Sequence, residues 1–440
     1  MYMKRLTLVL LIFPFTLLAQ DRLTVEDAIE IGLKYNYDIR IARNEAEIAQ
    51  KNAGYGTAGF LPTLDASGGY QLVNSDQETN SPIGFGESDT KSLSGSIALN
   101  WTLFDGFKMY AERDRFNALA RLGEYQARYS IENTVVAILR AYYNLVQQEQ
   151  LLDVSTNARD ISKTRYLKEK VRQELGGASS TDLLNSQVSL NNDEATLINQ
   201  ELLVSNARKD LNILLGRDAS APTEVDRRIV YRDLEYNMDD LCHMAKRNNS
   251  YLMLMEKSRV VAEKDVAAAK SSFLPRLSLN ASYGYTDSET ERAQSGGDSF
   301  FPPTVDSQNK DAVVGLTLSF NLFNGFRDKI NMQTARLAAE NQRLAYEYAE
   351  RELEGLVREQ YDTFRNQLRL IELEDQNVVA ARQNLELQQD RYAIGASSSL
   401  EFRDAQVNLI RAQTALIRAQ YQSRITRLEI EQLIGNLQID

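Results

Sequence analysis

The sequence has few of the residues that build disulfides, metal centres and catalytic sites. Its 440 residues include one cysteine and one histidine. One cysteine cannot form an intramolecular disulfide, and together with one histidine it cannot complete a four-ligand zinc site. A single histidine gives no basis for a Ser/His/Asp arrangement, and no Gly-x-x-x-x-Gly-Lys phosphate loop occurs. We therefore expect no metal, no cofactor and no enzymatic activity.

Basic clusters and long apolar runs are also missing. The formal net charge is −11, and no run of lysine and arginine suits a phosphate backbone, so nucleic acid is not an expected partner. Beyond residue 19, no window approaches 18 uncharged apolar residues, and we expect no transmembrane helix. If the mature protein enters a membrane, it must do so as strands.

The N-terminal segment, 1–19, has the pattern of a secretory signal peptide. Lys4 and Arg5 precede a 13-residue apolar run, and Ala19 is a small residue at a plausible cleavage point. The run is too short for a bilayer-spanning helix. We expect residues 1–19 to be removed and the mature chain to be exported.

Beyond this signal, the chain consists of two copies of one pattern. Phe-Leu-Pro at 60–62 returns at 273–275, and Leu-Phe-Asp-Gly-Phe at 103–107 returns as Leu-Phe-Asn-Gly-Phe at 322–326. Both motifs therefore return after nearly the same interval, about half the length of the chain. Two copies with so long a period indicate a duplicated domain rather than a solenoid. We expect a first repeat over 20–220 and a second over 221–440.

Each copy contains two segments in which apolar residues alternate with small polar ones. The alternation predicts strands of about ten residues, within hairpins over 60–105 and 273–324, and long polar loops over 74–91 and 286–311. An apolar face toward lipid and a polar face toward a wet lumen would explain it, although a half-buried soluble sandwich has the same pattern. The four alternating segments are 64–72, 93–103, 277–285 and 314–322.

The other segments have the seven-residue period of coiled coils. A helix over 108–174 lacks proline and would be roughly 100 Å long, and the second copy matches it at 328–394. Each long helix ends at a glycine-serine turn, after which a return helix is expected over 181–215 and 399–435. The heptad residues include Leu183, Leu190, Leu197, Val204 and Leu211 in the first copy, and Val357, Phe364, Ile371, Val378, Leu385 and Tyr392 in the second.

Four strands cannot close a membrane barrel, because the smallest closed examples have eight. The subunit must therefore oligomerise. Two subunits would give eight strands with a filled interior, whereas three would give twelve and leave room for a conduit. We prefer the trimer, although geometry alone does not force it.

The paired Phe-Leu-Pro starts, the Leu-Phe-Asp/Asn-Gly-Phe strand ends and the glycine-tipped coiled hairpins together resemble the TolC-like outer-membrane efflux family. The resemblance covers essentially the whole mature chain. It implies a mixed α and β fold with internal duplication, in which long antiparallel coiled-coil helices form a periplasmic α-barrel. Four membrane β-strands per subunit would complete a 12-stranded barrel in a homotrimer, located in the outer membrane with a periplasmic helical domain.

The resemblance also implies a function. The chain would be the outer-membrane channel of a tripartite efflux or type I secretion system, a passive exit duct in contact with outer-membrane lipid. Its partners would be a periplasmic adaptor (membrane fusion) protein and an inner-membrane transporter of the RND, ABC or MFS type. Small molecules or proteins would pass through it.

Site residues follow from the same resemblance. Glu401 and Asp404 match the acidic positions that ring the closed periplasmic mouth, and Tyr392 matches the tyrosine that holds it shut against an acidic residue of the first tip, here Asp182. Ser397 stands where the family often has a basic residue. The expected adaptor-docking tip residues are Gly176, Gly177, Ser179, Gly395 and Ser398. Independently of the resemblance, aromatic residues cluster where strands meet helical segments, as an interfacial aromatic belt would. The expected interfacial aromatic residues are Trp101, Phe104, Phe107, Phe323 and Phe326.

Two other interpretations account for parts of the sequence. A heavy-metal subtype would need soft ligands, but helical core packing explains the candidate residues better. A secreted or periplasmic trimeric coiled-coil structural or adhesin protein would share the signal peptide and the heptads, yet it gives no reason for the four alternating segments. The soft-ligand candidates are Met238, Cys242, His243, Met244, Met253 and Met255.

Overall fold

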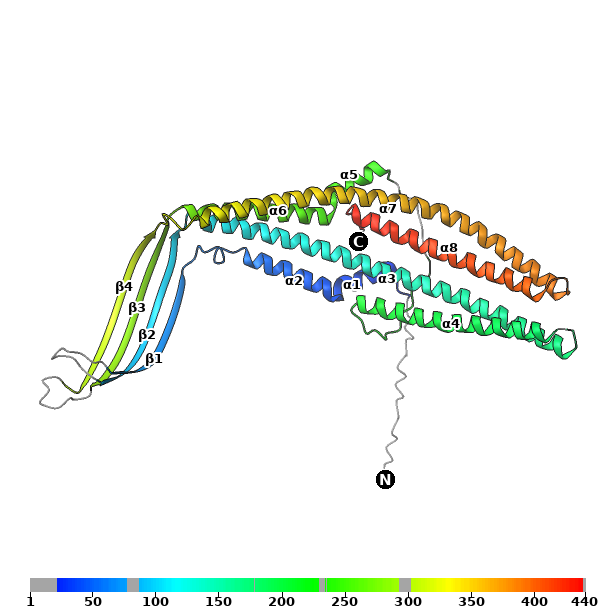
Figure 1. Ribbon diagram of the computed structural model, residues 1–440, viewed down its shortest axis with the longest axis horizontal. Helices are drawn as coiled ribbons and strands as arrows, with labels where there is room; N and C mark the ends of the chain where they lie inside the picture. Colours follow the sequence, from blue (N-terminus) through cyan, green and yellow to red (C-terminus); the bar gives the residue numbers. More distant parts are fainter. Residues whose placement is uncertain are drawn as a thin grey trace, which may run out of the picture. The chain divides into compact units, whose positions relative to one another are not determined.

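The computed structural model describes residues 22–76, 87–177, 179–228, 234, 236–292 and 302–437. The predicted signal peptide lies outside these residues, as do the central parts of the two predicted polar loops. The first set of elements is α1 (Val25–Tyr35), α2 (Tyr37–Asn52), β1 (Thr63–Asp76), β2 (Glu87–Phe104), α3 (Lys108–Glu174) and α4 (Ser180–Leu214). The second set is α5 (Met238–Asn248), α6 (Ser250–Lys270), a 3-10 turn (Ser271–Phe273), β3 (Arg276–Arg292), β4 (Thr304–Ser319), α7 (Arg327–Ala393) and α8 (Ser399–Leu433) (Figure 1).

The second set repeats the first in the order of its α-helices and β-strands, and the long and return helices also match in length. Both long helices, α3 and α7, have 67 residues, and both return helices, α4 and α8, have 35. Equal lengths in the same order are what an internal duplication produces. The mixed α and β fold class with a duplicated subunit is therefore confirmed.

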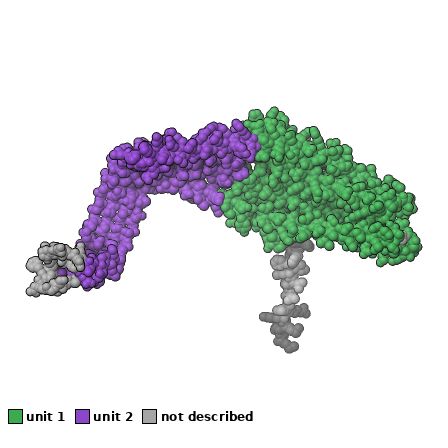
Figure 2. All heavy atoms as spheres, in the orientation of Figure 1, with its two compact units in different colours: residues 1–42, 130–249, 353–440 green, residues 43–129, 250–352 purple. Residues whose placement is uncertain are grey.

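The chain divides into two compact units, and each draws on both halves of the sequence (Figure 2). Unit 1 comprises residues 1–42, 130–249 and 353–440, and unit 2 comprises residues 43–129 and 250–352. The division follows the long helices α3 and α7, each of which contributes residues to both units. The strands belong to unit 2, and both helical hairpin tips belong to unit 1.

The four strands form one antiparallel sheet in the order β1-β2-β3-β4. Leu64, Leu99, Ala281 and Val314 pair in one continuous row across it. Three residues further along β1, a second row contains Ser67, Ser96, Gly284 and Asp311, and the hydroxyls of the two serines are 2.9 Å apart. Because the side-chain period of a strand is two, these rows lie on opposite faces. The register thus joins the alternating segments into one apolar and one polar face.

The expected strand length was wrong. The strands have 14 to 18 residues rather than about ten, and they extend into the segments assigned to polar loops. Polar cross-strand pairs continue the ladder there: the Thr90 and Thr290 hydroxyls are 3.1 Å apart, and Lys91 Nζ lies 3.1 Å from Glu291. Such pairs stabilise a sheet without apolar residues. The backbone hydrogen bonds between strands therefore continue beyond the point where the apolar and polar residues stop alternating. β4 also ends earlier than expected, at Ser319.

The heptad residues form the helical core. Val357, Phe364, Ile371, Val378, Leu385 and Tyr392 of α7 are each at most 8% exposed. In unit 1, Tyr142 belongs to a cluster of buried apolar side chains, and its buried hydroxyl donates to the carbonyl of Leu23 at 2.9 Å. Among the described residues, no helix combines the length and the apolar content needed to span a bilayer.

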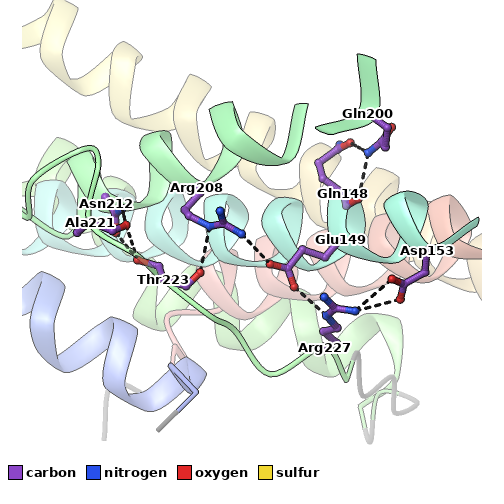
Figure 3. Close-up of polar contacts among 9 residues, drawn as sticks. All are labelled: Gln148, Glu149, Asp153, Gln200, Arg208, Asn212, Ala221, Thr223 and Arg227. Carbon is purple, nitrogen blue, oxygen red and sulfur yellow. Dashed lines mark hydrogen bonds and ion pairs between the residues drawn. The ribbon is translucent and has the colours of Figure 1, made fainter. Parts of the chain in front are cut away.

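The segment that follows α4 is fastened to the helices by ion pairs (Figure 3). Glu149 of α3 is buried and accepts from Arg208 Nη2 at 3.4 Å and from Arg227 Nε at 2.9 Å. Arg227 also reaches Asp153 at 3.0 Å, and Arg208 donates to the carbonyl of Thr223 at 3.1 Å. One buried carboxylate therefore holds the connection between the repeats against α3 and α4.

Candidate functional site

Both helical hairpins end in glycine-capped turns. Gly176 has φ +78° and Gly395 has φ +75°, in the left-handed region that glycine adopts without a Cβ penalty. The amide that follows each glycine donates to a carbonyl five residues earlier, at 2.7 Å and 2.8 Å, which caps the end of the helix. Ser179 and Ser398 then cap the starts of α4 and α8. The five predicted docking residues, Gly176, Gly177, Ser179, Gly395 and Ser398, are all exposed in the subunit.

Glu401 forms a capping box at the start of α8. Its carboxylate accepts from the amide of Ser398 at 2.8 Å and from the hydroxyls of Ser398 and Ser397, both at 3.0 Å. The Ser398 amide, followed by the two hydroxyls, holds the pKa of Glu401 below its usual value. Glu401 is therefore a charged, well-restrained carboxylate at neutral pH. Asp404 is exposed one turn further along the same helix.

Tyr392 is enclosed by three other side chains. Its hydroxyl donates to the carboxylate of Glu169 on α3, and its ring stacks on Phe402 of α8 with centroids 5.5 Å apart. The guanidinium of Arg172 lies over the ring, 5.5 Å from its centroid. We call Tyr392, Glu169, Phe402 and Arg172 the Tyr392 cluster. It joins α3, α7 and α8 immediately before the hairpin tips.

The acidic partner of Tyr392 differs from the expected one. Asp182 instead accepts from the hydroxyl of Ser179 at 2.7 Å and helps to cap α4. Glu169 is 2% exposed, and burial raises the pKa of its carboxyl group. The sequence analysis did not single out Glu169. The available signal was its spacing of seven residues from Ser162, because both polar residues occupy buried heptad positions of α3.

A second buried polar group links α3, α4 and α8. Arg403 makes a two-pronged ion pair with Asp193, at 2.5 Å and 2.9 Å. The hydroxyl of Ser162 donates to the same carboxylate at 2.5 Å, and the amide nitrogen of Gln406 donates to the carbonyl of Ala158 at 2.8 Å. The ion pair between Arg403 and Asp193, together with the hydroxyl of Ser162, fixes the positions of α8, α4 and α3 relative to one another. Sequence reasoning missed this group, although Arg403 lies between Glu401 and Asp404.

The predicted interfacial aromatic residues lie where strands meet helices, in unit 2. The indole of Trp101 donates to the carbonyl of Phe60 at 3.0 Å. Phe104 packs edge-on against Phe107, and Phe323 packs edge-on against Phe326, with centroids 5.2 Å and 5.5 Å apart. Phe107 and Phe326 have φ +66° and +63°, so both repeats hold a phenylalanine in the same strained backbone conformation.

Two of the soft-ligand candidates, Cys242 and His243, are neighbours on α5. Across the described ranges, no group of three or more His, Cys, Asp or Glu side chains is arranged to hold a metal ion. Cys242 is 8% exposed in α5, and burial raises the pKa of its thiol, whereas His243 is exposed.

Comparison with known proteins identifies the class of protein that this fold and these tips define. The family described as "Outer membrane efflux protein" matches residues 29–217 and 241–436. The chain is 22% identical over 396 residues to the outer membrane protein TolC of Vibrio cholerae, covering 88% of this chain and 86% of that protein. It is 24% identical over 413 residues to the alkaline protease secretion protein AprF of Pseudomonas aeruginosa, covering 90% and 82%. The crystal structure of the Campylobacter jejuni CmeC outer membrane channel superposes with a TM-score of 0.78 at 16% identity, covering 94% and 85%.

The chain belongs to the outer membrane efflux protein family. It is a homotrimeric outer-membrane channel of the efflux and type I secretion class, with a periplasmic helical domain, and it works with a periplasmic adaptor and an inner-membrane transporter. The family match favours this function over the coiled-coil scaffold that the heptads alone left open.

Proposed function

We propose that the hairpin tips are the periplasmic gate of this channel and that the Tyr392 cluster holds the gate closed. The hydrogen bond from Tyr392 to the buried Glu169 carries the proposal, because it ties α7 to α3 beside the tips. The Arg403–Asp193 pair would support it from α8 and α4. In this proposal each repeat, 20–220 and 221–440, supplies one hairpin, and Asp182 caps its helix rather than closing the gate.

The two tips would also receive the adaptor. Leu175 and Ile394 occupy equivalent positions in the two repeats, and each is 81% exposed beside a capping glycine. Exposed apolar side chains rimmed by polar residues are typical of interaction surfaces. We propose that they form the docking surface together with Gly176, Gly177, Ser179, Gly395 and Ser398. The channel itself would perform no chemistry, and the inner-membrane transporter would select the cargo.

Glu401 and Asp404 would give the gate its ion preference. A trimer carries three copies of each, and carboxylates gathered around a narrow pore attract cations. We expect the double variant Glu401→Ala/Asp404→Ala to lose most of its cation selectivity, measured as the reversal potential of single channels in planar bilayers under a salt gradient. The control is Glu372→Ala/Asp375→Ala, which removes two exposed carboxylates at the same spacing from α7. Equal selectivity in both variants would contradict the assignment.

The Tyr392 cluster is expected to make gating depend on pH. If opening exposes Glu169 to water, its pKa returns toward 4.5 from the value that burial raises in the closed form. The closed form then binds a proton more tightly than the open form. Protonation of Glu169 therefore stabilises the closed form fully below about pH 4.5. This stabilisation is lost as the pH rises through the raised pKa that Glu169 has in the closed form. The nearby charges are Arg172 and Arg165, which lower this pKa, and Asp182, which raises it.

Tyr392→Phe tests this arrangement, because it keeps the ring and removes the hydroxyl. A hydrogen bond to a charged group contributes about 1.5–3 kcal/mol, so the open probability should rise roughly tenfold or more. Glu169→Gln should abolish the pH dependence above pH 4.5. Tyr361→Phe removes a hydroxyl from the same helix and serves as the control. A Tyr392→Phe channel that gates like the parent would argue against the cluster as a latch.

A further inference from the structure

A pocket of about 320 Å³ lies beside the Tyr392 cluster, within unit 1. One wall is α3, which contributes Arg165 and Ile161 among others, and the opposite wall is formed by Tyr392 of α7 and Phe402 of α8. The lining is mixed: Ile161, Tyr392 and Phe402 supply apolar and aromatic surface, and the polar residues come from α3 except for Gln389 of α7. Pockets of this size and character are typical binding sites for small organic ligands.

Arg165 is the unusual residue of this pocket. It is 3% exposed, and its Nε and Nη1 atoms are buried without a hydrogen-bond partner among the described residues. Buried charges are normally paired, and a guanidinium remains charged because its pKa is so high. Burial, followed by repulsion from Arg403, lowers the pKa of Arg165 to about 10, which still leaves it protonated at neutral pH.

The carboxylates around Arg165 are already engaged. Asp193 is held by both terminal nitrogens of Arg403, and Glu169 accepts from Tyr392. Asp160 also lines the pocket, but it is paired with Arg159 at 2.8 Å. Lys168 adds a second positive charge to the lining. The pocket therefore presents the cationic groups and Ile161 on the α3 side, and the aromatic rings of Tyr392 and Phe402 on the α7 and α8 side.

We propose that this pocket binds a small organic carboxylate, whose carboxylate group pairs with Arg165 and whose apolar body lies against Ile161, Tyr392 and Phe402. Arginine binds carboxylates with strong, directional hydrogen bonds, and the apolar wall contributes by burial of the ligand's ring. The bound ligand contacts α3 on one side and α7 and α8 on the other. It thus ties together the same three helices as the Tyr392 cluster and favours the closed gate.

The probe for this site is 2-naphthoate, titrated into the purified trimer and followed by calorimetry. We expect saturable binding that is weakened about tenfold or more in Arg165→Gln, the range that one charge-assisted hydrogen bond supports. Lys163→Gln removes an exposed positive charge from the same helix outside the pocket and should bind normally. The neutral analogue 2-naphthamide lacks the carboxylate. Its affinity for the parent should therefore be no higher than the affinity of 2-naphthoate for Arg165→Gln.

Folding of the variant is checked separately. Because two guanidinium nitrogens of Arg165 are buried without a hydrogen-bond partner among the described residues, Arg165→Gln should melt no lower than the parent trimer. Absence of naphthoate binding to the parent, or equal binding to the parent and Arg165→Gln, would overturn the site. The same result would follow if Arg165→Gln lowered the melting temperature, since the guanidinium would then already be paired, for example by a neighbouring subunit.

The effect on gating rests on the proposed gate and is measured apart from binding. Naphthoate should lower the open probability of the parent channel and leave Arg165→Gln unchanged. Saturable binding without any change in open probability would retain the carboxylate site and overturn its coupling to the gate. A lower open probability in Arg165→Gln as well would indicate that naphthoate acts elsewhere, which would also overturn the coupling.

Discussion

Replacing Gly435 with alanine is expected to destabilise the subunit by about 3–5 kcal/mol, in the range that marks a severe backbone conflict. Gly435 has φ +64°, a conformation that costs about 1–2 kcal/mol for a residue with a Cβ. The new Cβ would also lie 2.4 Å from the carbonyl oxygen of Asn248 and 2.8 Å from its Cβ. Both atoms belong to a turn that Asn249 fastens to the carbonyl of Leu433 at 3.0 Å, so the turn cannot move freely.

The chain supplies a graded set of controls for this prediction. Gly176 has a positive φ, but a Cβ added there would meet no atom of the described residues within 4 Å, so Gly176→Ala should cost only the backbone strain. Gly355 lies inside α7 with neither constraint, and Gly355→Ala should stabilise by about 0.5–1 kcal/mol. Thermal unfolding of the purified trimers measures all three. A Gly435→Ala trimer as stable as the Gly176→Ala trimer would show that the Asn248 turn yields.

The second large effect concerns the contact between subunits, which the internal duplication allows us to locate. Inside unit 2, α6 of the second repeat runs antiparallel to α3 of the first: Arg115 pairs with Asp265, and Tyr129 lies against Tyr251 with ring centroids 5.4 Å apart. In a closed homotrimer, the second repeat of one subunit must meet the first repeat of the next. By equivalence, α7 would then meet α2 of the neighbouring subunit.

The exposure of equivalent residues supports this contact. Ile48 of α2 is 60% exposed in the subunit, whereas its counterpart Val261 of α6 is 9% exposed. Leu337 of α7 is 66% exposed, whereas its counterpart Ala118 of α3 is 7% exposed. Positions that are buried in one repeat are thus exposed at the equivalent places of the other repeat within the single subunit. Burying such apolar surface stabilises a trimer by about 25 cal/mol per Å².

Cross-linking tests the predicted contact. Asp38 of the first repeat is the counterpart of Tyr251, because the same interval separates the two Phe-Leu-Pro motifs. Tyr348 of the second repeat is the counterpart of Tyr129, because the same interval separates the two Leu-Phe-Asp/Asn-Gly-Phe strand ends. We expect Asp38→Cys/Tyr348→Cys, treated with a short bismaleimide, to give covalent dimers and trimers on a denaturing gel. Tyr251→Cys/Tyr129→Cys should react equally well but stay at the mass of one subunit. Cross-linked oligomers from the second pair and none from the first would contradict the equivalence.

Much of the fold could be predicted because repeated, local patterns encode it. The seven-residue spacing from Val357 to Tyr392 indicates a buried helical stripe, and the glycine-serine turns mark where each long helix reverses. The same approach gave strands that were too short, because Thr90, Lys91 and their partners lack an apolar alternation yet still pair. Among the residues predicted for a gate, Tyr392 lies beside the tip, and its hydroxyl donates to Glu169, which the sequence did not suggest, instead of Asp182.

The sequence by itself determined the duplicated plan, the two kinds of segment and the positions of the hairpin tips, since each depends on spacings along one strand or helix. Only the tertiary structure decided which charges are paired. Arg403 meets Asp193 across 210 residues, and Tyr392 meets Glu169 across 223. Arg165 is buried, and its Nε and Nη1 atoms find no hydrogen-bond partner in the part of the chain that the structure describes. Contacts of this kind depend on how three helices are rotated about their axes, and a small rotation exchanges one partner for another.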